Sequence, residues 1–189
     1  MVLFVHGSGS SRRSPRNQFV ARALHGTGLS TLLFDLLTRD EEEAEARDGH
    51  LRFNIPFLVE RLISATRWIA QQPPTKQQRI GYFGASTGGA AALVAAAELG
   101  TGIDAIVSRG GRPDLAGNTL GKVSAPTLLI VGERDDAVLR LNRKALAELA
   151  CPKNLAIVPK ATHLFEEPGT LEQVATLASA WFQQHLRSA

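Results

Sequence analysis

One short segment combines a serine with the glycines that a reactive serine requires. Gly84-Ala85-Ser86-Thr87-Gly88 follows the apolar run Arg79–Phe83, which has strand character, and precedes an alanine-rich segment with helical character. A serine between a strand and a helix lies on a strained turn that exposes its hydroxyl, and the flanking glycines let the neighbouring backbones pass close together. The amide of Thr87, at the start of the helix, would point toward developing negative charge. The segment therefore predicts Ser86 as a nucleophile and the Thr87 amide as one donor of an oxyanion hole.

A general base and an orienting acid are expected later in the chain, because a serine hydroxyl at its ordinary pKa is a weak nucleophile. Asp135 comes shortly after the end of one apolar run, and His163 comes shortly after the last apolar run. Along the chain, the candidates follow the order serine, acid, histidine, which is one of the orders in which Ser-His-Asp triads occur. We expect His163 to accept the Ser86 proton through one ring nitrogen while Asp135 holds the other, with Asp136 as the alternative acid.

A loop rich in glycine and serine follows the first apolar run and reads His6-Gly7-Ser8-Gly9-Ser10-Ser11. In this place it can present the second amide of an oxyanion hole, a role that we assign to Ser8, with Gly9 as the alternative. The loop lacks the G-K-[ST] ending of a Walker loop and the G-x-G-x-x-G spacing of a dinucleotide site, which argues against a nucleotide. We expect His6 to brace the loop.

Three arginines follow strand ends or the loop and are candidate substrate-binding residues. Arg12 and Arg13 come directly after the loop, and Arg109 follows the apolar run Ala105–Ser108. A guanidinium in a pocket attracts a carboxylate on the substrate. For each arginine, surface solvation or a structural ion pair is the alternative.

Short apolar runs alternate with longer helical patterns along the chain, which is typical of parallel βαβ units. The expected strands are Val2–Val5, Ser30–Phe34, Arg79–Phe83, Ala105–Ser108, Thr127–Val131 and Leu155–Val158. The expected helices are Pro15–Gly26, Pro56–Gln71, Ser86–Leu99, Arg140–Leu149 and Thr170–Leu186. The acidic stretch Asp40 to Asp48 is expected to be a solvated loop or helical turn. The chain of 189 residues suits one α/β domain over residues 1–189 rather than two domains.

Composition narrows the range of partners. The formal net charge is only +3 and the basic residues are scattered, which argues against nucleic acid. The single cysteine, Cys151, excludes an intramolecular disulfide and a Cys-based zinc cluster. No stretch approaches the roughly 20 apolar residues needed to cross a bilayer, and the apolar start is shorter than the roughly 7–15 residues of a secretory signal. We expect a soluble, cytoplasmic protein that does not engage membranes.

These motifs together resemble the dienelactone hydrolase-like branch of the α/β hydrolases. The segments that carry the resemblance are His6 to Arg12, Phe34 to Thr38, Gly84 to Gly88, Ser108 to Asp114, Gly132 to Asp135 and Ala161 to Phe165. The resemblance implies an α/β-hydrolase fold and hydrolysis of esters or lactones without a metal or organic cofactor. Dienelactone hydrolases proper use cysteine as nucleophile, so Ser86 points toward a general carboxylesterase.

The family's strand order implies a minimal six-stranded parallel sheet in the order 2-1-3-4-5-6, in this chain's own numbering of strands. Family members usually start with extra strands, whereas this chain starts at the strand of the oxyanion loop. Ser30–Phe34 would therefore form an apolar sheet edge, and an uncovered edge invites pairing with another chain. We expect a homodimer through this edge, and a monomeric mass in light scattering would count against it.

The leading hypothesis is a serine esterase that acts on small esters or lactones. Only Arg109 to Pro126 separate the fourth and fifth strands, too few residues for a helical lid domain, which favours an open site and short acyl groups. Acyl transfer or thioester hydrolysis would use the same residues. A non-catalytic binding protein on the same fold is the alternative from a different class.

Overall fold

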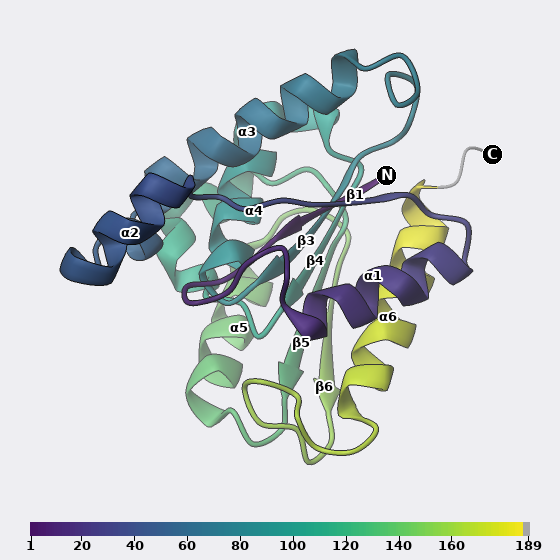
Figure 1. The fold of residues 1–189 in the computed structure, drawn as a ribbon. Coiled ribbons are helices and arrows are strands. Elements are labelled where there is room, and N and C mark those ends of the chain that lie inside the picture. Colours follow the sequence, from purple (N-terminus) through teal and green to yellow (C-terminus); the bar gives the residue numbers. More distant parts are fainter. Residues whose placement is uncertain (187–189) are drawn as a thin grey trace.

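Six parallel strands form one twisted sheet in the order β2-β1-β3-β4-β5-β6 (Figure 1). The computed structural model describes residues 1–186, apart from the side chains of residues 46–48. The strands are β1 (Val2–Val5), β2 (Thr31–Leu33), β3 (Gly81–Ala85), β4 (Ala105–Arg109), β5 (Thr127–Gly132) and β6 (Lys153–Val158). The predicted α/β-hydrolase strand order is confirmed.

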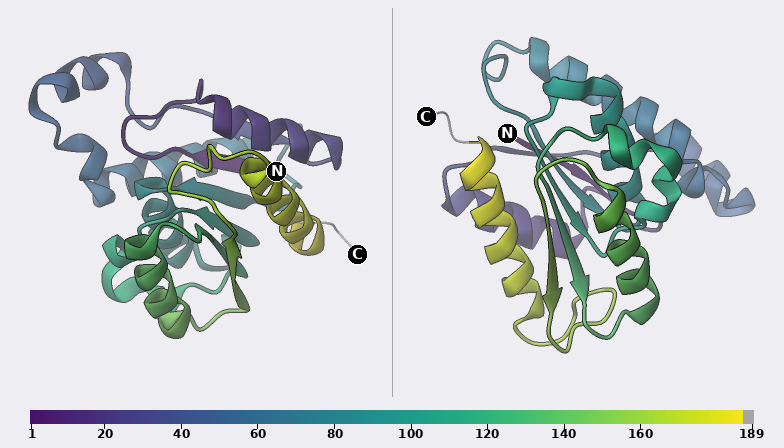
Figure 2. Two further views of the ribbon diagram at one scale, coloured as in Figure 1. Left: turned by 90° about the horizontal axis from the view of Figure 1, so that it is seen from below. Right: turned by 180° about the vertical axis from the view of Figure 1, so that it is seen from behind.

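Helices cover both faces of this sheet and give a three-layer arrangement. The α-helices are α1 (Pro15–Gly26), α2 (Arg39–Asp48), α3 (Ile55–Gln71), α4 (Thr87–Leu99), α5 (Asp136–Glu148) and α6 (Thr170–Leu186). The short 3-10 segments are η1 (Leu51–Phe53), η2 (Gly100–Gly102) and η3 (Pro113–Lys122). Helices α1 and α6 lie on one face, and α3, α4 and α5 lie on the other (Figure 2). Within residues 1–186, no helix is both long and apolar enough to span a membrane.

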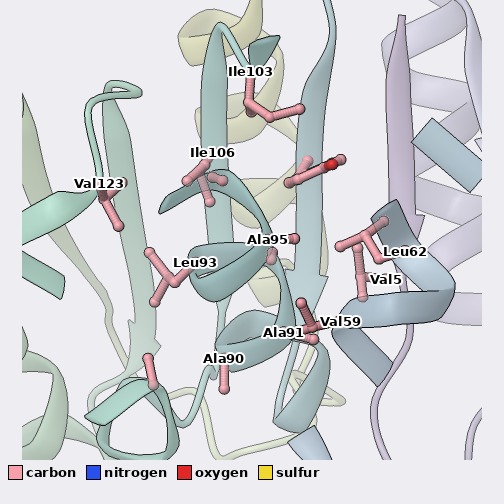
Figure 3. Close-up of a cluster of buried hydrophobic side chains, with 14 of the residues drawn as sticks. Val5, Val59, Leu62, Ala90, Ala91, Leu93, Ala95, Ile103, Ile106 and Val123 are labelled. Carbon is pink, nitrogen blue, oxygen red and sulfur yellow. The ribbon is translucent and has the colours of Figure 1, made fainter. Parts of the chain in front are cut away.

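The four central strands are buried along their whole length, which explains their continuous apolar runs. Helix α4 packs closely on them because most of its residues are alanine or glycine. Figure 3 shows side chains of α4 next to side chains of β1, α3 and β4. Those of α4 are Ala90, Ala91, Leu93 and Ala95, and those of the neighbouring elements are Val5, Val59, Leu62 and Ile106. This close packing fixes the position of the α4 N-terminus, directly after Ser86.

Helix α2 is the main difference from the predicted elements, because Asp40 to Asp48 was expected to be a loop or helical turn. The Thr38 hydroxyl accepts the Glu41 amide at 3.3 Å, and the Glu41 carboxylate accepts the Thr38 amide at 2.7 Å. This reciprocal pair is a capping box, which initiates a helix. Helix α2 carries polar side chains nearly all round, so hydrophobic periodicity gave no signal for it.

The other predicted elements agree with the structure apart from their ends. Strand β3 lies two residues later than Arg79–Phe83, and α5 begins at Asp136 instead of Arg140. Between β4 and β5 the chain contains only η3, so no helical lid arises there.

Strand β2 lies at the sheet edge, as the sequence predicted. It is only three residues long, Thr31–Leu33, and each of these residues is half-buried. Pairing of this edge with a second copy of the chain stays a prediction.

Candidate active site

The carboxyl ends of the parallel strands place the predicted site residues along one edge of the sheet. Ser86 follows β3, Asp135 lies three residues after β5, and His163 lies five residues after β6. The loop that begins at His6 follows β1. In open parallel sheets, ligands bind outside these carboxyl ends, so this edge is the candidate active site.

Ser86 lies on a strained turn. Its φ of 51° and ψ of −121° are in a region that residues with a side chain rarely adopt, and such a conformation costs on the order of 1–3 kcal/mol. Three backbone hydrogen bonds hold the turn. The Ser86 amide donates to the Arg109 carbonyl at 3.3 Å, and the Ser86 carbonyl accepts the amides of Gly89 at 3.0 Å and Arg112 at 3.1 Å. Strain that the surrounding structure maintains in this way is common at reactive residues.

The two glycines of the motif make this turn possible. A Cβ on Gly88 would lie 2.1 Å from the Val5 carbonyl oxygen, and a Cβ on Gly84 would lie 2.6 Å from the Gly88 carbonyl oxygen. Both contacts are with backbone atoms, so no side-chain rotation can relieve them. The start of α4 can therefore approach β3 only because Gly84 lacks a side chain, and it can approach β1 only because Gly88 lacks one.

We expect Gly88→Ala to lower the free energy of unfolding by about 3 kcal/mol or more, because the added methyl group overlaps backbone of β1. Gly26→Ala is the matched control, since a Cβ there meets no atom within 4 Å. Urea denaturation of both variants measures the difference. Equal midpoints for the two variants would contradict the close approach at Gly88.

Asp135 and His163 form the central polar contact of the site. The His163 Nδ1 lies 2.6 Å from the Asp135 Oδ2. The Asp135 side chain is 13% exposed and the His163 side chain 40% exposed, so the imidazole lies between a largely buried carboxylate and the solvent. An ionised carboxylate only accepts hydrogen bonds, so Nδ1 carries the proton and Nε2 has a free lone pair. The alternative acid, Asp136, is exposed and starts α5.

Ser86 and His163 both border the end of β4. The Ser86 amide is bound to the Arg109 carbonyl, and a Cβ on the next residue, Gly110, would lie 3.4 Å from the His163 Cε1. Within the described residues, Ser86 and His163 form no direct hydrogen bond. Catalytic hydrogen bonds are often long before a substrate binds, so this arrangement is compatible with proton transfer between the two.

The loop after β1 is braced by His6. The Leu36 amide donates to the His6 Nε2 at 3.0 Å, which leaves the proton on Nδ1, and Nδ1 donates to the Gly7 carbonyl at 3.0 Å. The Ser10 amide donates to the same carbonyl at 3.2 Å. Gly9 closes this turn with a φ of 72°, a conformation that glycine adopts without strain.

Ser8 and Thr87, whose amides are the predicted oxyanion donors, are joined by a hydrogen bond to the Thr87 side chain. The Ser8 amide donates to the Thr87 Oγ1 at 3.0 Å, and Thr87 is only 1% exposed. The predicted Ser8 donor is therefore engaged with a side chain in this structure. The amide of Gly9, the alternative donor, forms no hydrogen bond within the described residues.

The three candidate substrate-binding arginines lie in different environments. Asp35 accepts a hydrogen bond from the Arg12 amide at 2.6 Å and also forms an ion pair with the Arg12 guanidinium. Arg12 therefore forms a structural ion pair, which was the alternative to a role in substrate binding. Arg13 is exposed and forms no ion pair with any described residue. Arg109 is 8% exposed, and burial, with a contribution from the nearby Arg16, lowers the pKa of Arg109 to about 10. No motif or spacing in the sequence predicts that Arg16 lies near Arg109.

No group of three His, Cys, Asp or Glu side chains that could hold a metal ion occurs among the described residues. The only cysteine, Cys151, is buried, and its thiol contacts the Thr127 hydroxyl at the start of β5. Ser86 lies at the opposite, carboxyl end of the strands.

The family model of the dienelactone hydrolase family matches residues 13–186. The chain belongs to this family. A solved structure of a dienelactone hydrolase from Anabaena variabilis shares 59% sequence identity with it at a TM-score of 0.97, over 98% of this chain and 86% of that chain. The esterase Est1E from Butyrivibrio proteoclasticus shares the fold, with a TM-score of 0.80 at 15% identity over 97% of this chain and 86% of that chain.

This member of the dienelactone hydrolase family also matches a longer protein. A Mycobacterium tuberculosis protein, whose name marks it as a candidate phosphoribosyl transferase, is 59% identical over 186 residues, which are 98% of this chain and 41% of that protein. The chain thus spans less than half the length of this curated relative.

Proposed function

We propose that this dienelactone hydrolase family member is a serine hydrolase that cleaves small carboxylic esters or lactones. The observation that carries the proposal is the 2.6 Å hydrogen bond between Asp135 and His163, next to the strained turn of Ser86. Nucleophile, base and orienting acid are recognised by such geometry and roles.

In the proposed reaction, Asp135 fixes the His163 tautomer and stabilises the imidazolium that forms. Nε2 of His163 accepts the Ser86 proton while Oγ attacks the carbonyl carbon of the ester. His163 then protonates the leaving alcohol and leaves an acyl group on Ser86. A water molecule, deprotonated by the same imidazole, hydrolyses the acyl enzyme.

The oxyanion of each tetrahedral intermediate would be bound by the Thr87 amide, at the positive end of the α4 dipole. We propose the Ser8 amide as the second donor. Its bond to the Thr87 hydroxyl must be shared with the oxyanion or exchanged for it during the reaction. If the Ser8 amide keeps that bond, the unpaired Gly9 amide takes the role.

A small substrate fits the open surroundings of His163. The neighbouring Leu164 is 41% exposed, so it offers apolar surface to a short acyl chain beside the imidazole. Acyl transfer and thioester hydrolysis would use the same groups and differ in the leaving group or acceptor. We also propose a cytoplasmic location, which the single buried Cys151 supports.

Release of p-nitrophenol from its acetate and butyrate esters tests the proposed hydrolysis. We expect both esters to be cleaved, with a higher kcat/KM for one of these short acyl groups than for the laurate ester. A parallel assay with a thioester, and with an added alcohol as acceptor, identifies the preferred leaving group and acceptor. A folded protein that cleaves none of these compounds would contradict the proposal and favour a binding protein on the same fold.

A further inference from the structure

A short loop, Gly110-Gly111-Arg112, lies between the Ser86 turn and His163. On one side, the Arg112 amide donates to the Ser86 carbonyl at 3.1 Å. On the other side, a Cβ on Gly110 would lie 3.4 Å from both the Cε1 and the carbonyl oxygen of His163. The position of this loop therefore influences the separation between the proposed nucleophile and the proposed base.

The residues of this loop do little to fix its position by themselves. Gly110 and Gly111 have no side chain, and glycine loses more conformational freedom on folding than any other residue. The Arg112 guanidinium pairs with Asp114, which belongs to the segment that directly follows the loop. The Gly110 amide is attached to the Ile130 carbonyl of β5 at 2.7 Å. The middle of the loop, at Gly111, therefore depends on a contact from another element.

Asn142 of α5 provides this contact. Its Nδ2 donates to the Gly111 carbonyl at 3.0 Å and to the Val138 carbonyl of its own helix at 2.8 Å. The side chain is fully buried, and its Oδ1 accepts no hydrogen bond from any described residue. A buried acceptor without a donor lowers the stability of a fold. The contribution of the asparagine therefore lies in the N–H group that it donates to the loop.

Helix α5 connects this contact to the proposed acid. The helix begins directly after Asp135, and the Leu139 amide donates to the Asp135 carbonyl at 2.8 Å. The Leu139 side chain is buried in one cluster with Val131 of β5, which anchors the helix to the sheet without a contribution from Asn142. Asn142 thus attaches the loop beside the nucleophile and the base to the helix that follows the acid.

We infer that Asn142 is a positioning residue, which holds the loop Gly110-Gly111-Arg112 so that Ser86 and His163 keep the separation that proton transfer requires. Asn142 acts through the Gly111 carbonyl and not on the substrate. The kinetic part of the inference rests on the proposed function, whereas the attachment of the loop can be measured without catalysis. A displacement of reacting groups by about 1 Å can lower a rate by about 100-fold, so a single anchoring hydrogen bond can matter for kcat.

The kinetic test uses two variants at position 142 and a control on the same helix. Asn142→Leu removes the donor at similar volume, and Asn142→Ser keeps a hydroxyl that can reach only a carbonyl of its own helix. We expect both to lower kcat for p-nitrophenyl acetate by about 10- to 100-fold and to change KM less than about threefold, because the substrate contacts are retained. Leu149→Ala removes a buried side chain at the far end of α5, so it should lower the Tm but change kcat of the folded protein less than about threefold.

Amide hydrogen exchange, followed by NMR, tests the attachment of the loop without catalysis. The Arg112 amide reports on the loop through its bond to the Ser86 carbonyl, and the Leu139 amide reports on α5 through its bond to the Asp135 carbonyl. We expect Asn142→Leu and Asn142→Ser to raise the exchange rate at Arg112 relative to that at Leu139 by about tenfold or more, because the loop opens while the helix stays closed. Leu149→Ala should leave this ratio within about threefold of the parent ratio.

The outcomes separate the role of Asn142 from the proposed hydrolysis. An active parent protein whose folded Asn142→Leu and Asn142→Ser variants keep the parent kcat, or the parent exchange ratio, would overturn the positioning role alone. A loss of kcat that Leu149→Ala reproduces would be general destabilisation and would also overturn it, as would a rise in KM at constant kcat. Faster exchange at Arg112 in the Asn142 variants of a protein that cleaves no ester would support the attachment of the loop and contradict the esterase.

Discussion

Replacement of Ser86 by alanine is expected to lower kcat for p-nitrophenyl acetate by about four to six orders of magnitude, because the proposed acyl enzyme forms on the Ser86 hydroxyl. The fold should be unaffected, since the backbone bonds that hold this turn do not involve the hydroxyl. Ser86→Gly should be as inactive but more stable by about 1 kcal/mol, because glycine adopts a positive φ without strain. Rates of p-nitrophenol release and urea denaturation measure both effects.

Ser108→Ala is the matched control for this experiment. Ser108 is the last but one residue of the neighbouring strand β4, and its buried hydroxyl oxygen has no hydrogen-bond partner in the described part of the chain. Loss of this hydroxyl should change kcat less than about threefold and should not lower the free energy of unfolding. Residual activity of Ser86→Ala close to that of Ser108→Ala would show that Ser86 is not the nucleophile.

Replacement of Asp135 by asparagine is expected to lower kcat by about four orders of magnitude. The asparagine amide can donate a hydrogen bond to the His163 Nδ1, which shifts the imidazole proton to Nε2 and removes the lone pair that accepts the Ser86 proton. The loss of the negative charge also removes the stabilisation of the imidazolium. We expect the effect on kcat to exceed the effect on KM, because the acid acts in the transition state and not in substrate binding.

Asp136→Asn distinguishes the two adjacent carboxylates. Asp136 is exposed at the first turn of α5, so its replacement should cost only about 0.3–1 kcal/mol of helix-dipole stabilisation. The kcat of Asp136→Asn should stay within about threefold of the parent value, because substitutions at the surface usually have small effects. The opposite result, a large loss in Asp136→Asn and a small one in Asp135→Asn, would assign the orienting role to Asp136.

Most of the fold could be predicted because local signals agree with the tertiary structure. Helix α1 has the predicted bounds, since Ser14 followed by Pro15 is a strong start signal and the Ser14 side chain caps the helix in the structure. The buried strands could be recognised in the sequence as apolar runs. Helix α2 was missed because its signal is the capping box at Thr38 and Glu41 and not a hydrophobic stripe.

The site could be predicted in part. Ser86, Asp135 and His163 each follow a strand, and parallel topology alone brings the ends of strands to one edge. Apart from the pair of Asp135 and His163, the side-chain partners could not be predicted, because they depend on contacts between distant segments. The Ser8 amide bonds to a hydroxyl 79 residues away, and the Arg109 guanidinium meets a side chain 92 residues away. No spacing rule connects such residues.

The most direct test of the central claim is covalent labelling by a fluorophosphonate, which reacts with activated serines and not with ordinary ones. The protein is treated with the probe, its intact mass is measured, and the modified peptide is located by mass spectrometry. We predict one adduct per chain on Ser86, absent in Ser86→Ala and strongly slowed in His163→Ala. A folded protein that remains unlabelled, or that carries the adduct on another residue, would contradict the assignment of Ser86 as an activated nucleophile.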